Sequence, residues 1–87
     1  MYLHLGKNTV VRRDDVVAVF DLDNSSQSYL TREYLRHADQ NGQIVNISED
    51  LPKSFVVCST PSGEQIVYLS QLSSATLLKR SETMSFE

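Results

Sequence analysis

Two apolar segments, Val16-Val-Ala-Val-Phe20 and Ser54-Phe-Val-Val-Cys58, dominate this sequence of 87 residues. Neither segment alternates apolar with polar residues, as a strand does when one face of its sheet meets water. Both are rich in valine, and β-branched side chains favour extended backbone. The pattern predicts that each segment is a strand buried on both faces of a sheet.

Residues typical of turns separate these two segments from further short strands. Gly6 and Lys7 separate two short runs near the N-terminus, which predicts a hairpin, and a charged turn at 12–15 follows it. Thr60-Pro-Ser-Gly63 supplies the proline and glycine of a second hairpin turn. The predicted strands are residues 2–5, 8–11, 16–20, 43–47, 54–58 and 65–69.

One substantial helix is predicted, over residues 28–40, where apolar residues recur at helical spacing. Its apolar face consists of Leu30, Tyr34, Leu35 and Ala38. Short polar side chains at 23–26 offer caps before it, and Gly42 offers a stop after it.

A last short helix is predicted to run through Arg80, with Ser73 or Ser74 as its N-terminal cap. Together these elements predict an α+β fold: a small, mostly antiparallel β-sheet with one amphipathic helix and a short C-terminal helix. We interpret residues 1–81 as a single domain and residues 82–87 as a flexible tail.

The amount of apolar strand points to self-association. A chain of this size buries about 60–65% of the surface that its unfolded form exposes, so its core is thin. One substantial helix is too little to cover two apolar strands. Another copy of the protein is the economical cover for the remaining apolar surface, so we predict a homo-oligomer.

Composition excludes several classes of protein. The hydrophobic content of 40% and charged content of 22% are those of a globular chain and not of a disordered one. No segment approaches the roughly 20 apolar residues of a membrane helix, and residues 1–15 lack the apolar core of a signal peptide. The single cysteine, Cys58, cannot form an internal disulfide. These features predict a cytoplasmic protein that does not bind a membrane.

The spacing of the candidate catalytic and metal-binding residues is not that of a metal-binding or phosphate-binding motif. The cluster of Asp14, Asp15, Asp21 and Asp23 does not match a calcium-binding loop. His4 and His37 have no acidic or cysteine partner at a ligand-like interval, and the three glycines are scattered singly instead of forming a phosphate loop. We therefore predict no metal, no cofactor and no enzymatic activity.

Basic residues are the remaining candidates for function. The net charge is −3 and the isoelectric point about 5.2, yet residues 1–13 carry three basic and no acidic residues while residues 14–23 carry four acids. Such a polarised chain can present a basic face to nucleic-acid phosphates. The alternative is that these charges only keep the surface soluble, and that Arg80 stabilises a helix C-terminus. The candidate nucleic-acid-binding residues are Arg12, Arg13, Lys53, Lys79 and Arg80.

Three segments resemble the Rem family of bacterial extracellular-matrix (biofilm) regulators, specifically its RemB-type branch. They are Tyr2-Leu-His-Leu-Gly6, Asp15-Val-Val-Ala-Val-Phe-Asp21 and Tyr68-Leu-Ser-Gln-Leu-Ser-Ser-Ala-Thr-Leu-Leu-Lys-Arg80. The resemblance runs from residue 1 to about residue 81. The last segment, with its LSS-x-TL-x-KR ending, is the most specific of the three.

The resemblance implies DNA-binding transcriptional activators of matrix operons. It also implies a LytTR-like protomer that assembles into rings of seven or eight copies. The RemA branch uses arginines beside its third strand and in a turn before the next central strand. Here the first place holds Asp15, or Arg13 in a shifted alignment, and the second, at 49–54, retains Lys53 beside two acids.

The sequence thus favours a cytoplasmic, ring-forming regulator of matrix-gene transcription that binds duplex DNA. One alternative is a ring-forming interaction protein that modulates a sister regulator without contacting DNA. Another is a small RNA-binding ring, which would need an aromatic stacking platform, whereas the tyrosines and phenylalanines here have good core or interface positions.

Overall fold

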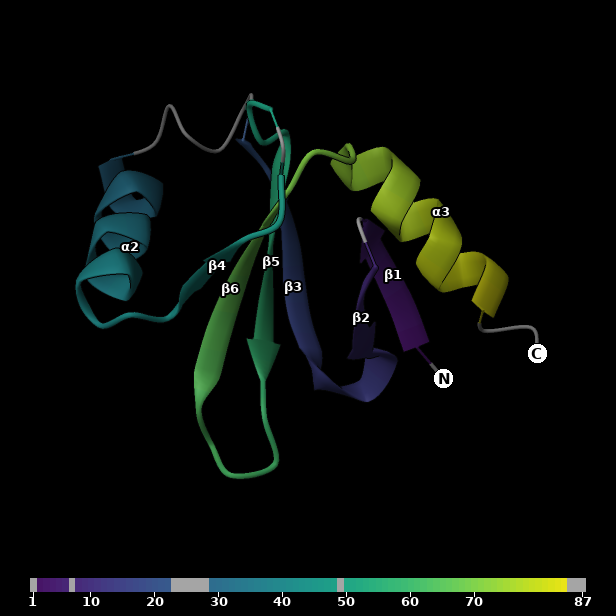
Figure 1. Cartoon of the computed structure of the whole chain (residues 1–87), viewed down its shortest axis with the longest axis horizontal. Helices are drawn as coiled ribbons and strands as arrows, with labels where there is room; N and C mark the ends of the chain where they lie inside the picture. The colour runs from purple at the N-terminus through teal and green to yellow at the C-terminus, as the bar shows by residue number, and fades with distance from the viewer. Residues whose placement is uncertain (1, 7, 23–28, 49, 85–87) are drawn as a thin grey trace.

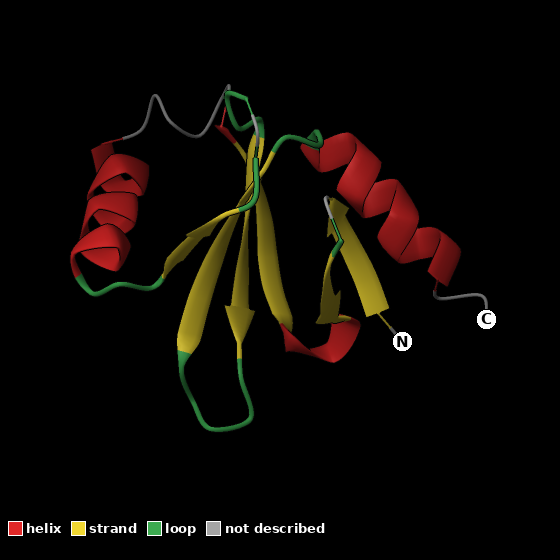
Figure 2. Ribbon diagram, in the orientation of Figure 1, coloured by secondary structure: helices red, strands yellow, loops and turns green. Residues whose placement is uncertain are grey.

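The structure is a computed structural model of residues 1–87, and it describes residues 2–6, 8–22, 29–48 and 50–84. Its strands are β1 (Tyr2–Gly6), β2 (Thr9–Arg12), β3 (Val16–Asp21), β4 (Ile44–Asn46), β5 (Ser54–Ser59) and β6 (Gln65–Ser70). Its helices are the short 3₁₀ turn η1 (Arg13–Asp15), α2 (Tyr29–Gln40) and α3 (Ser74–Met84). The predicted α+β class is confirmed (Figure 2).

The strands form two separate sheets. β1 and β2 make an antiparallel hairpin, as predicted from the turn at Gly6. The other four strands lie in the order β3-β5-β6-β4, in which β3–β5 and β5–β6 are antiparallel and β4 runs parallel to β6. The second predicted hairpin is confirmed too, because the Gly63 amide donates to the Thr60 carbonyl across its turn. The sheet is therefore mostly antiparallel, with one parallel pair.

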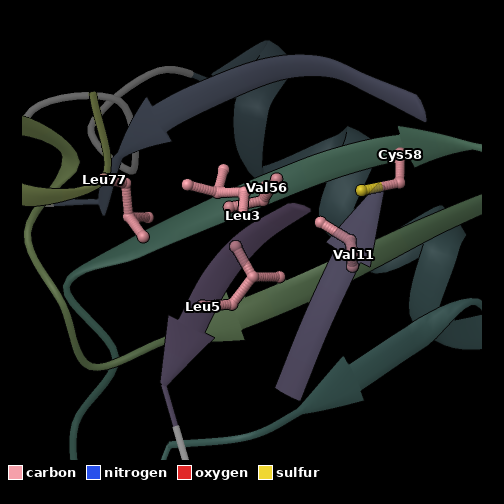
Figure 3. Close-up of a cluster of buried hydrophobic side chains, with 6 residues drawn as sticks. All are labelled: Leu3, Leu5, Val11, Val56, Cys58 and Leu77. Atoms are coloured by element: carbon pink, nitrogen blue, oxygen red, sulfur yellow. The ribbon is translucent and has the colours of Figure 1, made fainter. Parts of the chain in front are cut away.

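The four-stranded sheet is the middle of three layers (Figure 1). The β1–β2 hairpin and α3 cover one face, and α2 lies on the other. Successive residues of β5 point to opposite faces, so Val56 and Cys58 join one core cluster while Phe55 and Val57 join the other. Figure 3 shows the first cluster, which consists of Leu3, Leu5, Val11, Val56, Cys58 and Leu77.

The burial predicted for β5 is confirmed, whereas the burial predicted for β3 is wrong. Residues 54–58 of β5 are all buried because two strands flank this strand and both of its faces are covered. β3 lies at the edge of the sheet, and within the protomer none of its residues is fully buried. Val17 is 61% exposed. An apolar run alone does not reveal whether a strand is central or at an edge, since that depends on strand order.

Two buried serines connect the layers. The Ser70 hydroxyl donates to the Leu5 carbonyl at 2.7 Å and accepts from the Leu72 amide at 3.1 Å. The Ser54 hydroxyl donates to the Leu72 carbonyl at 2.7 Å. Both serines are fully buried, where an unpaired polar group would be costly, so these bonds fix the hairpin and the start of α3 to the end of the sheet.

The helix ends follow local chemistry, with one correction. Gly42, at a φ of +68°, ends α2 as predicted. The Ser73 hydroxyl accepts from the Thr76 amide at 3.1 Å, which identifies Ser73 as the cap of α3. The predicted helix end at Arg80 is wrong, because α3 continues to Met84 and so includes residues 82–84 of the predicted tail. No glycine or proline follows Arg80 to stop it. The predicted capping residues 23–26 and the tail residues 85–87 lie outside the described part of the chain.

Cys58 is expected to be chemically inert in the folded protein. Burial, followed by the negative charge of Asp15, raises the pKa of its thiol from 9.0 to about 11. At pH 8 only about one thiol in 1,000 is then the reactive thiolate, so labelling by a maleimide should be at least about 100-fold slower in native than in urea-unfolded protein. Because the fold disfavours the thiolate, stability should fall as the pH rises from 9 towards 11. Equal labelling rates in the two states would show that the thiol is accessible.

Candidate nucleic-acid interface

The outer face of the β1–β2 hairpin is exposed and carries polar side chains beside the apolar Val10, which pairs with His4. Along β1 the residues alternate, so that Leu3 and Leu5 enter the core while Tyr2 and His4 face solvent. On β2, Arg12 is exposed and pairs across the strands with Tyr2. A tyrosine, a histidine and an arginine therefore share one surface. Aromatic rings and guanidinium groups are the side chains that contact bases and phosphates.

Arg12 and Arg13 lie where the hairpin passes into η1. Arg12 is the last residue of β2 and Arg13 the first of η1, so the extended backbone ends between them. Among the described residues, the Arg12 side chain has no acidic partner, whereas Arg13 is partly buried and has an interaction of its own. Asp14 and Asp15 follow in the same short turn and limit the positive potential there.

Helix α3 brings a further basic residue, Arg80, to the hairpin. The Arg80 guanidinium donates to the backbone carbonyl of His4 at 3.5 Å, across 76 residues of sequence. His4 and Tyr2 are two residues apart on β1, which is about 7 Å along a strand, and Tyr2 is opposite Arg12. Arg80 and Arg12 thus flank the same strand. Lys79 is exposed on the same helix. We call Tyr2, His4, Arg12, Arg13, Lys79 and Arg80 the hairpin face.

Lys53 is not part of the hairpin face. It precedes β5, and its backbone amide donates to the Ser70 carbonyl at the end of β6, near the start of α3. Its side chain is exposed in a loop that also carries the exposed Asp50. The structure therefore places Arg12 and Arg80 beside the same strand, with Arg13 and Lys79 next to them in sequence, and places Lys53 near the Leu5 end of β1, away from the Tyr2 end where Arg12 lies.

The C-terminal motif divides into a structural part and an exposed part. Ser73 caps α3, Thr76 hydrogen-bonds to it at 2.9 Å between hydroxyls, and Leu77 is fully buried in the core. Lys79 and Arg80, by contrast, face solvent. The first half of the motif is explained by capping and packing, whereas the second half carries two exposed basic residues, of which Arg80 contacts β1.

Sequence reasoning missed the contribution of Tyr2 and His4. Their signal was the alternation of polar and apolar residues in β1, which marks an outward face. It did not stand out because the hairpin is short and neither residue has a charged neighbour in sequence.

Other kinds of site are not evident in the described part of the chain. There, no group of three or more histidine, cysteine, aspartate or glutamate side chains is arranged to hold a metal ion. Among the helices described, none has the length and apolar character needed to cross a membrane.

Comparison with known proteins agrees with the resemblance seen in the sequence. The family model described as "RemA-like: Extracellular matrix regulatory protein A-like" matches residues 2–80. The chain is also similar to Extracellular matrix regulatory protein B of Bacillus subtilis (strain 168), with 38% identity over 84 residues, which cover 97% of this chain and 94% of the relative. Because the match covers nearly the whole of both chains, the two proteins are similar over the entire domain and not only in one motif. The chain belongs to the RemA-like family of extracellular matrix regulatory proteins, in its RemB-type branch.

Proposed function

We propose that the protein is a cytoplasmic regulator of extracellular-matrix (biofilm) gene transcription that assembles into a ring and contacts duplex DNA through its hairpin face. The relative's name indicates a regulator of the extracellular matrix and not an enzyme. The LytTR-like character of the protomer and a ring of seven or eight copies are part of the same proposal.

The observation that carries the proposal is the placement of Arg12 and Arg80 beside the same strand β1, with Arg13 and Lys79 next to them in sequence, in a chain with a net charge of −3. Arg12 ends the hairpin, Arg13 begins η1, and Lys79 and Arg80 come from the far end of the sequence. Side chains that only maintain solubility need not converge, whereas side chains that bind a polyanion must.

Several copies of the protein must contact the same duplex to give a useful affinity for DNA. One copy would neutralise only a few phosphates, and Asp14 and Asp15 beside Arg13 weaken the local attraction. Several copies in one assembly would bind the same duplex with a high effective concentration for each further contact. The mechanism would therefore be architectural, with DNA wrapped or bridged by repeated phosphate contacts and with modest sequence preference.

Duplex length tests this mechanism. We expect a duplex of about 60 base pairs to bind at least about tenfold more tightly, per mole of duplex, than one of about 12 base pairs, since the short duplex spans too few copies. Fluorescence anisotropy at about 50 mM salt measures both, with single-stranded RNA of matched length as the competitor. Equal affinity for the two duplexes would contradict the architectural mechanism, and preference for the RNA would favour an RNA-binding ring.

The second candidate is modulation of a sister regulator without DNA contact. The position of Lys53 favours it, because this residue lies apart from the hairpin face and shares its loop with Asp50. Absence of duplex binding by the assembled protein at low salt, together with binding of a sister protein, would support this candidate.

A further inference from the structure

The outer face of the β1–β2 hairpin carries an exposed apolar side chain among its polar ones. Val10 of β2 is 42% exposed and lies directly opposite His4 of β1. Tyr2 and Arg12, the next outward-facing pair, lie opposite each other too. Side chains opposite each other in an antiparallel pair share a face, while the residues between them in sequence enter the core (Figure 3). One surface therefore combines a guanidinium group, two aromatic rings and an isopropyl group.

This combination is not the one that phosphate contact alone requires. Phosphates are bound by cations and hydrogen-bond donors, and an isopropyl group supplies neither. In the major groove, thymine presents its 5-methyl group, which packs against apolar side chains. Guanine presents two acceptors there, which one arginine can contact together. Val10 and Arg12 match these two features of the base edges.

The spacing of the hairpin also fits a stack of base pairs. Val10 and Arg12 are two residues apart on β2, which is about 6.8 Å along an antiparallel strand. Base pairs in a duplex are about 3.4 Å apart, so the two side chains are separated by about two base-pair steps. Paired strands lie about 4.8 Å apart, and the major groove, which is about 12 Å wide, admits a two-stranded ribbon.

A basic residue lies beside the hairpin, where the phosphates that border a groove would approach. The Arg80 guanidinium of α3 donates to the His4 carbonyl at 3.5 Å, which holds its charge next to β1. The hairpin is a sheet of its own, separate from the four-stranded sheet, and its outward side chains are exposed. Base contacts from the ribbon and phosphate contacts from α3 are therefore compatible.

We propose that the β1–β2 hairpin reads base edges in the major groove of DNA, with Val10 against a thymine methyl group and Arg12 at a guanine about two base pairs away. This inference rests on the proposed function, since it concerns the same hairpin face and the same ligand, duplex DNA. It adds a contribution from the bases to phosphate contacts that are alike for every sequence.

Two duplexes that differ only in the methyl groups of thymine test the contact of Val10. Both have about 60 base pairs of the same mixed sequence, and one contains uracil at every thymine position, so phosphates and hydrogen-bonding groups are identical. Loss of one buried methyl contact weakens binding about fourfold, and the loss multiplies when several copies bind one duplex. The protein should bind the thymine duplex at least about tenfold more tightly, by fluorescence anisotropy at about 50 mM salt.

Substitutions at Val10 show whether this residue senses the methyl group. Val10→Ser removes the apolar contact, so the variant should bind the two duplexes with affinities within about twofold of each other. Val10→Ile keeps an apolar, β-branched side chain and should retain the preference for thymine. Val45→Ser is the matched control, because Val45 is 41% exposed on β4 in the other sheet and should leave the preference unchanged. Circular dichroism verifies that each variant is folded.

Replacing guanine by 7-deazaguanine tests the contact of Arg12 in the same way. This base lacks the N7 acceptor but keeps its Watson–Crick pairing. One good arginine–guanine contact changes affinity by roughly 5–150-fold, so the protein should bind the modified duplex at least about fivefold more weakly. Arg12→Ala leaves the other basic residues of the hairpin face in place and should bind the two duplexes equally.

The possible outcomes separate this inference from the proposed function. Equal binding of the thymine and uracil duplexes would overturn the base contact of Val10, and so would a preference that Val10→Ser retains. Equal binding of the guanine and 7-deazaguanine duplexes would overturn the base contact of Arg12. Failure to bind any of these duplexes would instead contradict the proposed function itself.

Discussion

Replacing Arg12 and Arg13 together by alanine is expected to abolish binding to a long DNA duplex while the assembly remains intact. Both residues lie where β2 passes into η1 and neither belongs to a core cluster, so the fold should tolerate the change, which circular dichroism verifies. Each copy loses two positive charges, and the loss recurs at every copy that touches the duplex. Fluorescence anisotropy with a duplex several tens of base pairs long measures the effect, and light scattering verifies the assembly.

The salt dependence of the parent protein sets the size of this effect. With about 6–10 phosphate contacts, affinity should fall by roughly 10³–10⁵ between 50 and 200 mM salt. The double variant should show little remaining binding from which to measure a slope. Binding by the variant equal to that of the parent would rule out the hairpin face as the DNA interface.

The matched control also removes two positive charges, but from the layer on the other side of the sheet. Arg32 and Arg36 are both exposed on α2, on the opposite side of the sheet from the hairpin. Their double replacement by alanine changes the net charge equally. If DNA is bound through the hairpin face, this control should reduce affinity by much less than the Arg12 and Arg13 variant does.

Phe55→Ala is expected to be the most destabilising single core substitution. Phe55 lies in the central strand β5, is 2% exposed, and stacks on Phe20 with the ring centroids 4.8 Å apart. Removing a buried phenylalanine ring costs about 3–5 kcal/mol, which is most of the stability of a small domain. Urea unfolding followed by circular dichroism at a fixed protein concentration measures the loss.

Phe20→Ala tests whether strand position explains that loss. Phe20 is the stacking partner of Phe55 but belongs to the edge strand and remains partly exposed. Its replacement should cost about 1–2 kcal/mol, because less surface is returned to water. Equal losses at the two positions would mean that β3 is buried in the assembled protein to the same degree as β5.

The sequence predicted what depends on near neighbours in the chain. Gly42 ends α2 because a positive φ is easy for glycine, and Ser73 caps α3 because its hydroxyl reaches an amide three residues on. The hairpin turns and the helical period of residues 28–40 are equally local properties. The family resemblance also came from the sequence, since it rests on the identity of residues and not on their contacts.

The tertiary structure decided what depends on packing between distant segments. The runs in β3 and β5 look alike in sequence, yet strand order makes β5 central and leaves β3 at the edge beside an apolar groove. Arg80 joins the hairpin face only because α3 packs along β1, and Lys53 lies away from Arg12 because its strand begins near the Leu5 end of β1, whereas Arg12 pairs with Tyr2 at the other end. These positions are set by the packing that buries the most apolar area. That packing depends on the whole chain, so it cannot be read from a short stretch of sequence.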